Sequence, residues 1–258
     1  MTASRRDILQ ATAKYTGIER IELAKPMSER LRVEISPQQS VTAIVYAGAR
    51  TGRGGVTLIL GHGAGAGQTS DFIVDFAGGL AVRGIDVVTF NFSYSEQGRR
   101  IPDPNDRLED CWRAVMEAVR RHMKSDTDAL AIGGKSMGGR IASQVAAGGI
   151  GGLAGLVFLG YPLHPPGRPE RLRAEHLADI KVPMLFVQGS RDAFGTPDEL
   201  RPIVAPLHPA AEVHVVEGGD HSFKVRKGAG ISREDIYRAI QDRIAAWLHE
   251  IVAFKRVQ

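Results

Sequence analysis

The chain has 258 residues, of which 43% are hydrophobic and 24% charged. This length and composition indicate one large globular domain and exclude a disordered, collagen-like or coiled-coil protein. The net charge is +4, and because the basic residues are interspersed with acidic ones, we expect no nucleic-acid partner. A single cysteine excludes an internal disulfide and a multi-cysteine zinc site.

No apolar run approaches the roughly 20 residues that a transmembrane helix needs, so we expect no membrane partner. The N-terminal segment carries Arg5 and Arg6 but no apolar stretch after them, which is not the pattern of a secretion signal. The sequence therefore predicts a cytoplasmic protein.

Short apolar runs alternate with amphipathic segments along most of the chain. Residues 1–30 are polar and predict an N-terminal extension, followed by a domain of residues 31–258. The expected strands are 31–35, 41–46, 56–60, 85–90, 129–133, 153–159, 183–188 and 213–216. The expected helices are 71–82, 106–123, 137–147, 171–178, 197–204 and 233–254. This alternation predicts an α/β fold with a mostly parallel sheet covered by helices on both faces, and such sheets carry their sites at the carboxyl ends of strands.

The segment after the expected strand 129–133 contains the pattern G-x-S-x-G, with Ser136 at its centre. A sharp turn from strand to helix would expose the Ser136 hydroxyl above the sheet, and Gly134 and Gly138 would avoid side-chain collisions there. We therefore predict Ser136 as a nucleophile. The alternative interpretation is a glycine-rich turn in which Ser136 only caps the following helix.

Two phosphate-binding motifs can be weighed against this interpretation. A Walker A loop ending at Gly134-Lys135-Ser136 would need a glycine where Ala129 stands. The glycines from 61 to 67 do not form G-x-G-x-x-G in any register, and the next strand ends at Asn91 rather than at an acidic residue. The sequence thus predicts no nucleotide cofactor.

A catalytic serine needs a base and a group that orients the base. His221 follows the expected strand 213–216, and Asp192 follows the strand 183–188. The order Ser136, Asp192, His221 is that of the α/β-hydrolase triad. Asp198 and Asp220 are the alternative acids.

An acyl-transfer intermediate carries an oxyanion that needs backbone N–H donors. Met137, directly after the nucleophile, is expected to supply one donor. The loop after strand 56–60 should supply the other, with Ala64 as the first candidate and Gly63 as the second. His62 is interpreted as a structural loop residue.

With these motifs, the chain from about residue 31 to residue 254 resembles the α/β-hydrolase superfamily. More narrowly it is similar to the small dienelactone-hydrolase-like family that includes the testis-expressed protein thirty and the third subunit of the NSL chromatin complex. The residues that carry this closer resemblance are 61–67, 91–94, 134–140, 160–167 and 189–192. Residues 160–182 are too few for a separate cap domain, so a single domain with an open site is expected.

The resemblance implies an eight-stranded, mostly parallel sheet with an early antiparallel strand. It also implies hydrolysis of a small-molecule carboxylic ester or thioester through an acyl-enzyme, without metal or cofactor. Some members of the narrower family act as scaffolds, so the alternatives are a non-catalytic interaction protein and an acyltransferase with the same triad.

The loop after strand 85–90 is expected to border the site and to bind substrate through Tyr94, Arg99 and Arg100. With Arg191 beside the proposed acid, these arginines would favour an anionic acyl or leaving group. Alternatively, the arginines are solvated or pair with Asp103, Asp106 and Glu96. Cys111, on the apolar face of helix 106–123, is predicted to be a packed, inert thiol.

Overall fold

The computed structural model describes residues 28–49, 55–122, 129–226 and 230–255. Within them, one eight-stranded sheet runs through the molecule in the order β1-β2-β4-β3-β5-β6-β7-β8. The strands are β1 (Ser28–Ser36), β2 (Gln39–Tyr46), β3 (Val56–Gly61), β4 (Asp86–Phe90), β5 (Ala129–Lys135), β6 (Leu153–Leu159), β7 (Met184–Gly189) and β8 (Ala211–Val216). β2 pairs antiparallel with both β1 and β4, and the pairs from β4 to β8 are parallel. The expected sheet with an early antiparallel strand is confirmed.

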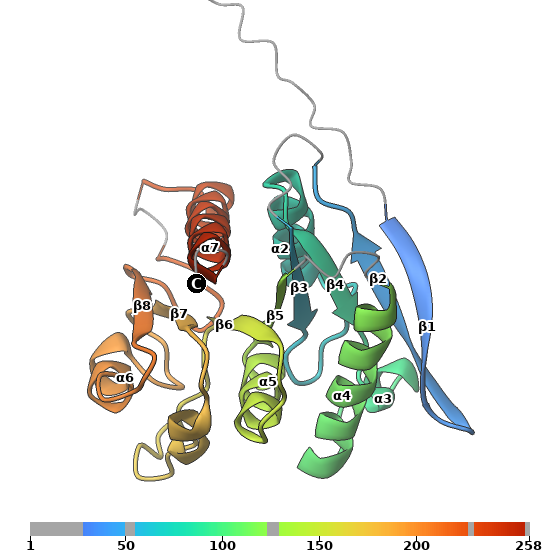
Figure 1. Cartoon of the computed structure of the whole chain (residues 1–258). Helices are drawn as coiled ribbons and strands as arrows, with labels where there is room; N and C mark the ends of the chain where they lie inside the picture. The colour runs from blue at the N-terminus through green and yellow to red at the C-terminus, as the bar shows by residue number, and fades with distance from the viewer. Residues whose placement is uncertain (1–27, 50–54, 123–128, 227–229, 256–258) are drawn as a thin grey trace, which may run out of the picture.

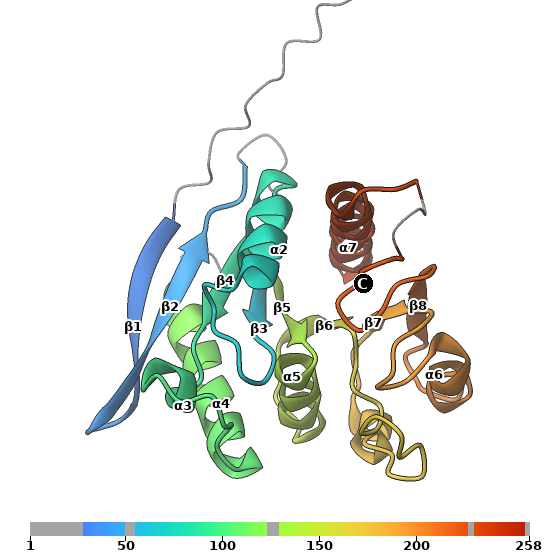
Figure 2. The same cartoon turned by 180° about the vertical axis from the view of Figure 1, so that it is seen from behind.

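Helices cover both faces of this sheet (Figure 1). They are α2 (Asp71–Val82), α3 (Ser93–Glu96), α4 (Asn105–His122), α5 (Met137–Ala147), the 3₁₀ helix η2 (Glu175–Asp179), α6 (Pro197–Val204) and α7 (Arg233–Lys255). α2 and α7 lie on one face, and α4, α5 and α6 lie on the other, as the view from behind also shows (Figure 2).

Each face of the sheet has its own hydrophobic core. The central strands are buried along their whole length, as in β3 and β6, because helices cover both of their faces. Trp112 of α4 belongs to the core on one face, and Trp247 of α7 belongs to the core on the other. None of the described helices combines the length and apolar character needed to cross a bilayer.

The structure differs from the sequence prediction mainly at element ends. β1 begins at Ser28, so the last three residues of the predicted extension belong to the sheet, while residues 1–27 lie outside the described residues. β5 continues to Lys135 because Gly134 and Lys135 still pair with β6. The helix predicted at 171–178 is the shorter η2, and the four-residue helix α3 was not predicted.

Because β3, β5, β7 and β8 run parallel, their carboxyl ends meet at one edge of the sheet. The loops that leave this edge carry the residues predicted to form the site. Between β6 and β7 the chain adds only a loop and η2, which agrees with the predicted absence of a large cap domain.

Candidate active site

Ser136 stands at the turn between β5 and α5, at the N-cap position of the helix. Its backbone has φ 51° and ψ −116°, a conformation that costs a residue with a side chain about 1–3 kcal/mol. Its hydroxyl makes no capping hydrogen bond, so the interpretation of Ser136 as a simple helix cap is not supported. The turn is tight: a Cβ atom on Gly138 would stand 2.7 Å from the carbonyl oxygen of His62.

Within the predicted triad, His221 lies within hydrogen-bond distance of both Ser136 and Asp192. His221 Nε2 is 2.8 Å from Ser136 Oγ, and His221 Nδ1 is 2.8 Å from Asp192 Oδ2. An ionised carboxylate only accepts hydrogen bonds, so Asp192 fixes the proton on Nδ1. Nε2 is then free to accept the proton of the Ser136 hydroxyl.

The Asp192 carboxylate is held rigidly at the end of β7. Its side chain is 0% exposed. Oδ2 accepts a hydrogen bond of 2.9 Å from Gln188 Nε2, and Oδ1 accepts one of 2.8 Å from the Phe194 backbone N–H. These donors compensate the burial of the carboxylate and orient it toward His221.

The two alternative acids, Asp220 and Asp198, form contacts with groups other than the His221 ring. Asp220 Oδ1 accepts the backbone N–H groups of Ser222 and Lys224 and so shapes the turn around His221. Asp198, with a side chain 90% exposed, pairs with Arg201 on α6. Neither contact is with the His221 ring.

His221 is also held by groups other than Asp192. Lys135 Nζ donates a 2.6 Å hydrogen bond to the His221 carbonyl oxygen, and the Phe194 ring stacks on the imidazole with centroids 4.2 Å apart. Burial lowers the pKa of Lys135 from 10.5 to about 7, against the attraction of Asp192 and Asp220. Lys135 therefore holds the backbone of His221, Phe194 holds one face of its ring, and Asp192 holds Nδ1.

The loop after β3 faces Ser136, since a Cβ atom on Gly63 would stand 3.7 Å from the Ser136 Cβ. His62 Nε2 accepts the Phe92 backbone N–H at 3.3 Å, so Nδ1 carries the ring proton and donates it to the Gly63 carbonyl at 2.8 Å. Burial lowers the pKa of His62 to about 4, which keeps this tautomer neutral.

The trans peptide that joins Gly63 and Ala64 is planar, so fixing its carbonyl oxygen directs the Ala64 N–H to the opposite side. Ala64 lines the same cavity as Ser136. Met137 also lines it, and as the first residue of α5 it has an N–H without an intrahelical partner. Met137 and Ala64, the two predicted oxyanion donors, thus line the same cavity as Ser136.

The cavity that contains Ser136 and His221 measures about 570 Å³. Its lining includes three apolar side chains, Phe72, Ile73 and Phe194, together with two arginines, Arg140 and Arg173. The arginines come from α5 and from the segment between β6 and β7.

The predicted substrate contacts of Tyr94, Arg99 and Arg100 do not fit their positions, because none of the three lines this cavity. Tyr94 is fully buried in α3, with its ring against His62 at a centroid distance of 5.9 Å. Arg99 forms a 2.7 Å ion pair with Asp103, as the alternative interpretation held. The short helix α3 turns Tyr94 inward, and this turn was not predicted.

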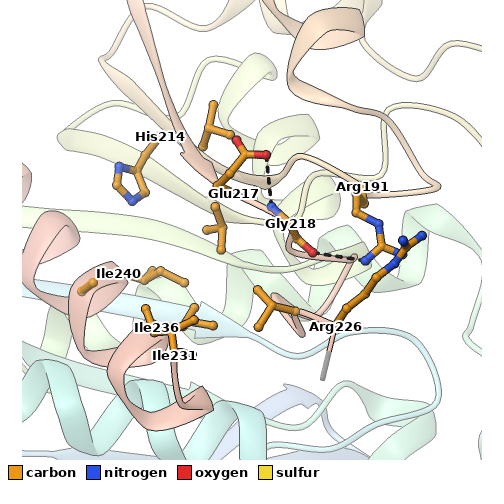
Figure 3. A pocket seen from close by; sticks show the side chains of 12 residues that line it. Arg191, His214, Glu217, Gly218, Arg226, Ile231, Ile236 and Ile240 are labelled. Atoms are coloured by element: carbon orange, nitrogen blue, oxygen red, sulfur yellow. Dashed lines mark hydrogen bonds between the residues drawn. The ribbon is translucent and has the colours of Figure 1, made fainter. Parts of the chain in front are cut away.

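Arg191 lies at a second cavity, of about 610 Å³, which contains none of the triad residues (Figure 3). There its guanidinium donates to the Gly218 carbonyl at 3.3 Å. Isoleucines from α7 and the segment before it, among them Ile236 and Ile240, form the apolar side of this cavity.

Cys111 is fully buried in α4, and burial raises its pKa to about 12, so the thiol has the packed environment that the sequence predicted. Within the described part of the chain, His, Cys, Asp and Glu side chains form no group of three or more that could bind a metal ion.

Five residues of the site were not identified from the sequence: Lys135, Arg140, Arg173, Gln188 and Phe194. Lys135 had a signal, since a lysine beside the nucleophile at the end of a buried strand must find a polar partner. Arg140 lies within the segment 134–140, but no local pattern marked its side chain as part of the site. Arg173, Gln188 and Phe194 carry no local pattern.

A family described as alpha/beta hydrolase domain matches residues 54–249. A lidless α/β serine hydrolase from Xanthomonas campestris is 22% identical over 88% of this chain and 94% of its own, with a TM-score of 0.64. The dienelactone hydrolase from Anabaena variabilis is 16% identical over 88% and 98%, with a TM-score of 0.67. Est1E from Butyrivibrio proteoclasticus, solved with ferulic acid, is 13% identical over 86% and 99%, with a TM-score of 0.67.

These solved structures share the fold of the chain. The family match extends over most of its length, from the start of β3 to the last turns of α7. The protein therefore belongs to the alpha/beta hydrolase domain family.

Proposed function

We propose that this protein is a serine hydrolase that cleaves a carboxylic ester or thioester through an acyl-enzyme. The observation that carries the proposal is the pair of 2.8 Å contacts that link Ser136 Oγ, the His221 ring and Asp192 Oδ2. Their position at the carboxyl edge of the sheet, beside two candidate N–H donors, gives each group a role in acyl transfer.

In the first half-reaction, Ser136 Oγ attacks the carbonyl carbon while His221 Nε2 accepts the hydroxyl proton. The electron pair of the carbonyl double bond moves to its oxygen, where the N–H groups of Met137 and Ala64 stabilise the negative charge. Asp192 stabilises the imidazolium through Nδ1. The bond to the alcohol or thiol then breaks, and the leaving group takes the proton from Nε2.

In the second half-reaction, His221 Nε2 accepts a proton from water as the water oxygen attacks the acyl carbon. The oxyanion forms again between the same donors. When it collapses, the bond to Ser136 Oγ breaks, the proton returns to the serine, and a carboxylic acid leaves.

We also propose that the chain is a member of the dienelactone-hydrolase-like branch that contains the testis-expressed protein thirty and the third NSL subunit. The motifs at 134–140 and 160–167 support this finer assignment. The intact hydrogen-bonded triad favours a catalyst over a scaffold, and water as the acceptor distinguishes a hydrolase from an acyltransferase.

Labelling with a fluorophosphonate probe tests the proposal. We expect stoichiometric labelling of the wild type, loss of labelling in Ser136→Ala, and release of carboxylic acid from a simple thioester. Ser143→Ala is a matched control, because Ser143 also contacts a histidine, His176, at 2.7 Å. Ser143 is fully buried and donates to the Arg140 carbonyl, so this variant should still be labelled.

Unlabelled, catalytically silent wild-type protein with an intact fold would establish the scaffold alternative. Transfer of the acyl group to an added alcohol or thiol, without release of acid, would establish the acyltransferase.

A further inference from the structure

Two arginines line the cavity that contains Ser136, and they come from different elements. Arg140 lies in the first turn of α5, where its backbone N–H donates to the Ser136 carbonyl at 3.0 Å. Arg173 lies between β6 and β7, and its backbone N–H donates to the Leu163 carbonyl at 2.8 Å. Both backbones are thus fixed relative to the nucleophile.

The Arg140 guanidinium is held by neutral acceptors. It donates to Asn105 Oδ1 at 3.1 Å and to Gln144 Oε1 at 3.2 Å. These contacts orient the guanidinium and leave its charge uncompensated. Burial, and then the charge of Arg173, lower the pKa of Arg140, so the two cations are close enough to repel each other.

Two acids in the surroundings of these arginines pair with other arginines. Asp103 lines the same cavity, but its carboxylate pairs with Arg99 at 2.7 Å. Glu109 attracts Arg140 through space, yet its Oε2 pairs with Arg113 at 3.0 Å. Within the described residues, neither Arg140 nor Arg173 forms an ion pair with a carboxylate.

We propose that Arg140 and Arg173 bind a carboxylate carried by the acyl part of the substrate, so that the enzyme prefers half-esters or half-thioesters of dicarboxylic acids. This inference rests on the proposed hydrolase function. An anion between the two guanidinium groups replaces their repulsion with two sets of charge-assisted hydrogen bonds.

We assign the substrate carboxylate to the acyl part because Arg140 and Ser136, whose Oγ would carry the acyl group, belong to adjoining turns. Arg140 follows Ser136 by one helical turn, about 6 Å along the axis of α5. The acyl group stays bonded to Ser136 through both half-reactions, so a guanidinium on the next turn can hold its far end throughout. We therefore assign acyl chains of moderate length, such as glutaryl or adipyl.

Hydrolysis of matched esters tests the inference. The 4-nitrophenyl half-ester of adipic acid is compared with 4-nitrophenyl hexanoate, which has the same acyl chain length without the charge, and enzyme-free rates are subtracted. We expect kcat/KM to be about tenfold or more higher for the half-ester, as for other charge-assisted contacts. That ratio should fall toward one in Arg140→Gln and Arg173→Gln and with rising salt.

Three further variants separate this role from a structural one. Arg140→Lys keeps the charge and should retain part of the preference, because a lysine lacks the bidentate geometry. Arg121→Gln and Arg201→Gln should leave the ratio at the wild-type value, because each arginine pairs with an exposed acid and neither lines the cavity.

Binding provides a readout that does not depend on turnover. Adipate titrated calorimetrically into Ser136→Ala should bind, and the additional change Arg140→Gln should weaken this binding about tenfold or more. Equal kcat/KM for both esters, with no adipate binding, would overturn the inference and leave the hydrolase proposal intact. Adipate binding without hydrolysis of either ester would uphold the anion site and reject the hydrolase.

Discussion

Asp192 accepts hydrogen bonds from three directions, the His221 ring, the Gln188 side chain and the Phe194 backbone. A carboxylate suits this position because every one of its neighbours there donates. An amide in its place would present N–H groups to at least one donor and would favour the wrong imidazole tautomer.

We therefore expect Asp192→Asn to lower kcat by about 10³–10⁴-fold in steady-state ester hydrolysis, with little change in the fold. Asp198→Asn is the matched control, because its exposed side chain only pairs with Arg201, and it should retain wild-type kcat. A strong loss in Asp198→Asn with an active Asp192→Asn would reassign the acid.

Lys135 offers a second test at the scale of one residue. Its pKa is lowered by burial from 10.5 to about 7, so above pH 7 the unfolded chain holds a proton that the folded chain has lost. The free energy of unfolding contributed by this group is lowest below pH 7 and rises as the pH increases toward 10.5. Asp192 and Asp220 act in the opposite direction, because their charges attract the protonated amine.

We expect the wild type to gain stability relative to Lys135→Met between pH 7 and pH 9.5, by on the order of 3 kcal/mol in urea unfolding curves. Lys181→Met is the control, since Lys181 also donates to a carbonyl, that of Ala178, but from an exposed position. Parallel pH profiles for wild type and Lys135→Met would contradict the assigned shift.

The candidate site shows what a sequence can predict at this scale. The G-x-S-x-G turn and the order of the acid and base predicted that Ser136, Asp192 and His221 would lie together, and the structure places them so; their catalytic roles stay predictions. Arg140 was missed although it lies in the segment 134–140, because the pattern there marks only the serine and the glycines, and Arg173 was missed because it comes from a distant segment, between β6 and β7. The prediction placed the site arginines in the loop after β4, where α3 turns Tyr94 into the core.

At the scale of elements, the predicted helices 71–82, 137–147 and 197–204 match the structure end for end. Each begins at a clear signal, such as the Thr196 capping box before α6. Strand ends were less accurate, because pairing extends a strand past its apolar run. β8 begins at Ala211 rather than at residue 213 since Ala211 pairs with Met184.

The contact between β3 and α5 can be tested with a single methyl group. A Cβ atom on Gly138 would collide with backbone atoms of the loop that carries Ala64, including the His62 carbonyl at 2.7 Å. We expect Gly138→Ala to lower the free energy of unfolding by about 1–3 kcal/mol and to reduce turnover by displacing the two proposed oxyanion donors. Gly151→Ala is the control, because nothing lies within 4 Å of its Cβ position. Similar melting temperatures for the two variants would contradict this packing.

At the scale of the whole molecule, one sheet supports two hydrophobic cores. The central strands contribute side chains to both, so neither core can open without disturbing the sheet that supports the other. We expect the two cores to unfold together.

The fluorescence of the two tryptophans can report the unfolding of each core separately. Trp112 lies in the core with α4 and α5, and Trp247 lies in the core with α2 and α7. Trp112→Phe leaves a probe in one core, and Trp247→Phe leaves a probe in the other. In each variant the fluorescence transition in urea should coincide with the loss of far-UV circular dichroism. A fluorescence midpoint well separated from the dichroism midpoint in one variant would show that the cores unfold independently.

The positive φ of Ser136 has a consequence for how this protein could change over time. Glycine adopts such a backbone readily, so Ser136→Gly removes both the hydroxyl and the backbone strain. Ser136→Ala removes the hydroxyl but keeps the backbone strain. We expect the inactive glycine variant to melt at a higher temperature than the inactive alanine variant, and equal melting temperatures would argue against strain at this turn. Selection for stability alone would favour replacing Ser136 with glycine, and only selection for the proposed activity would oppose that replacement.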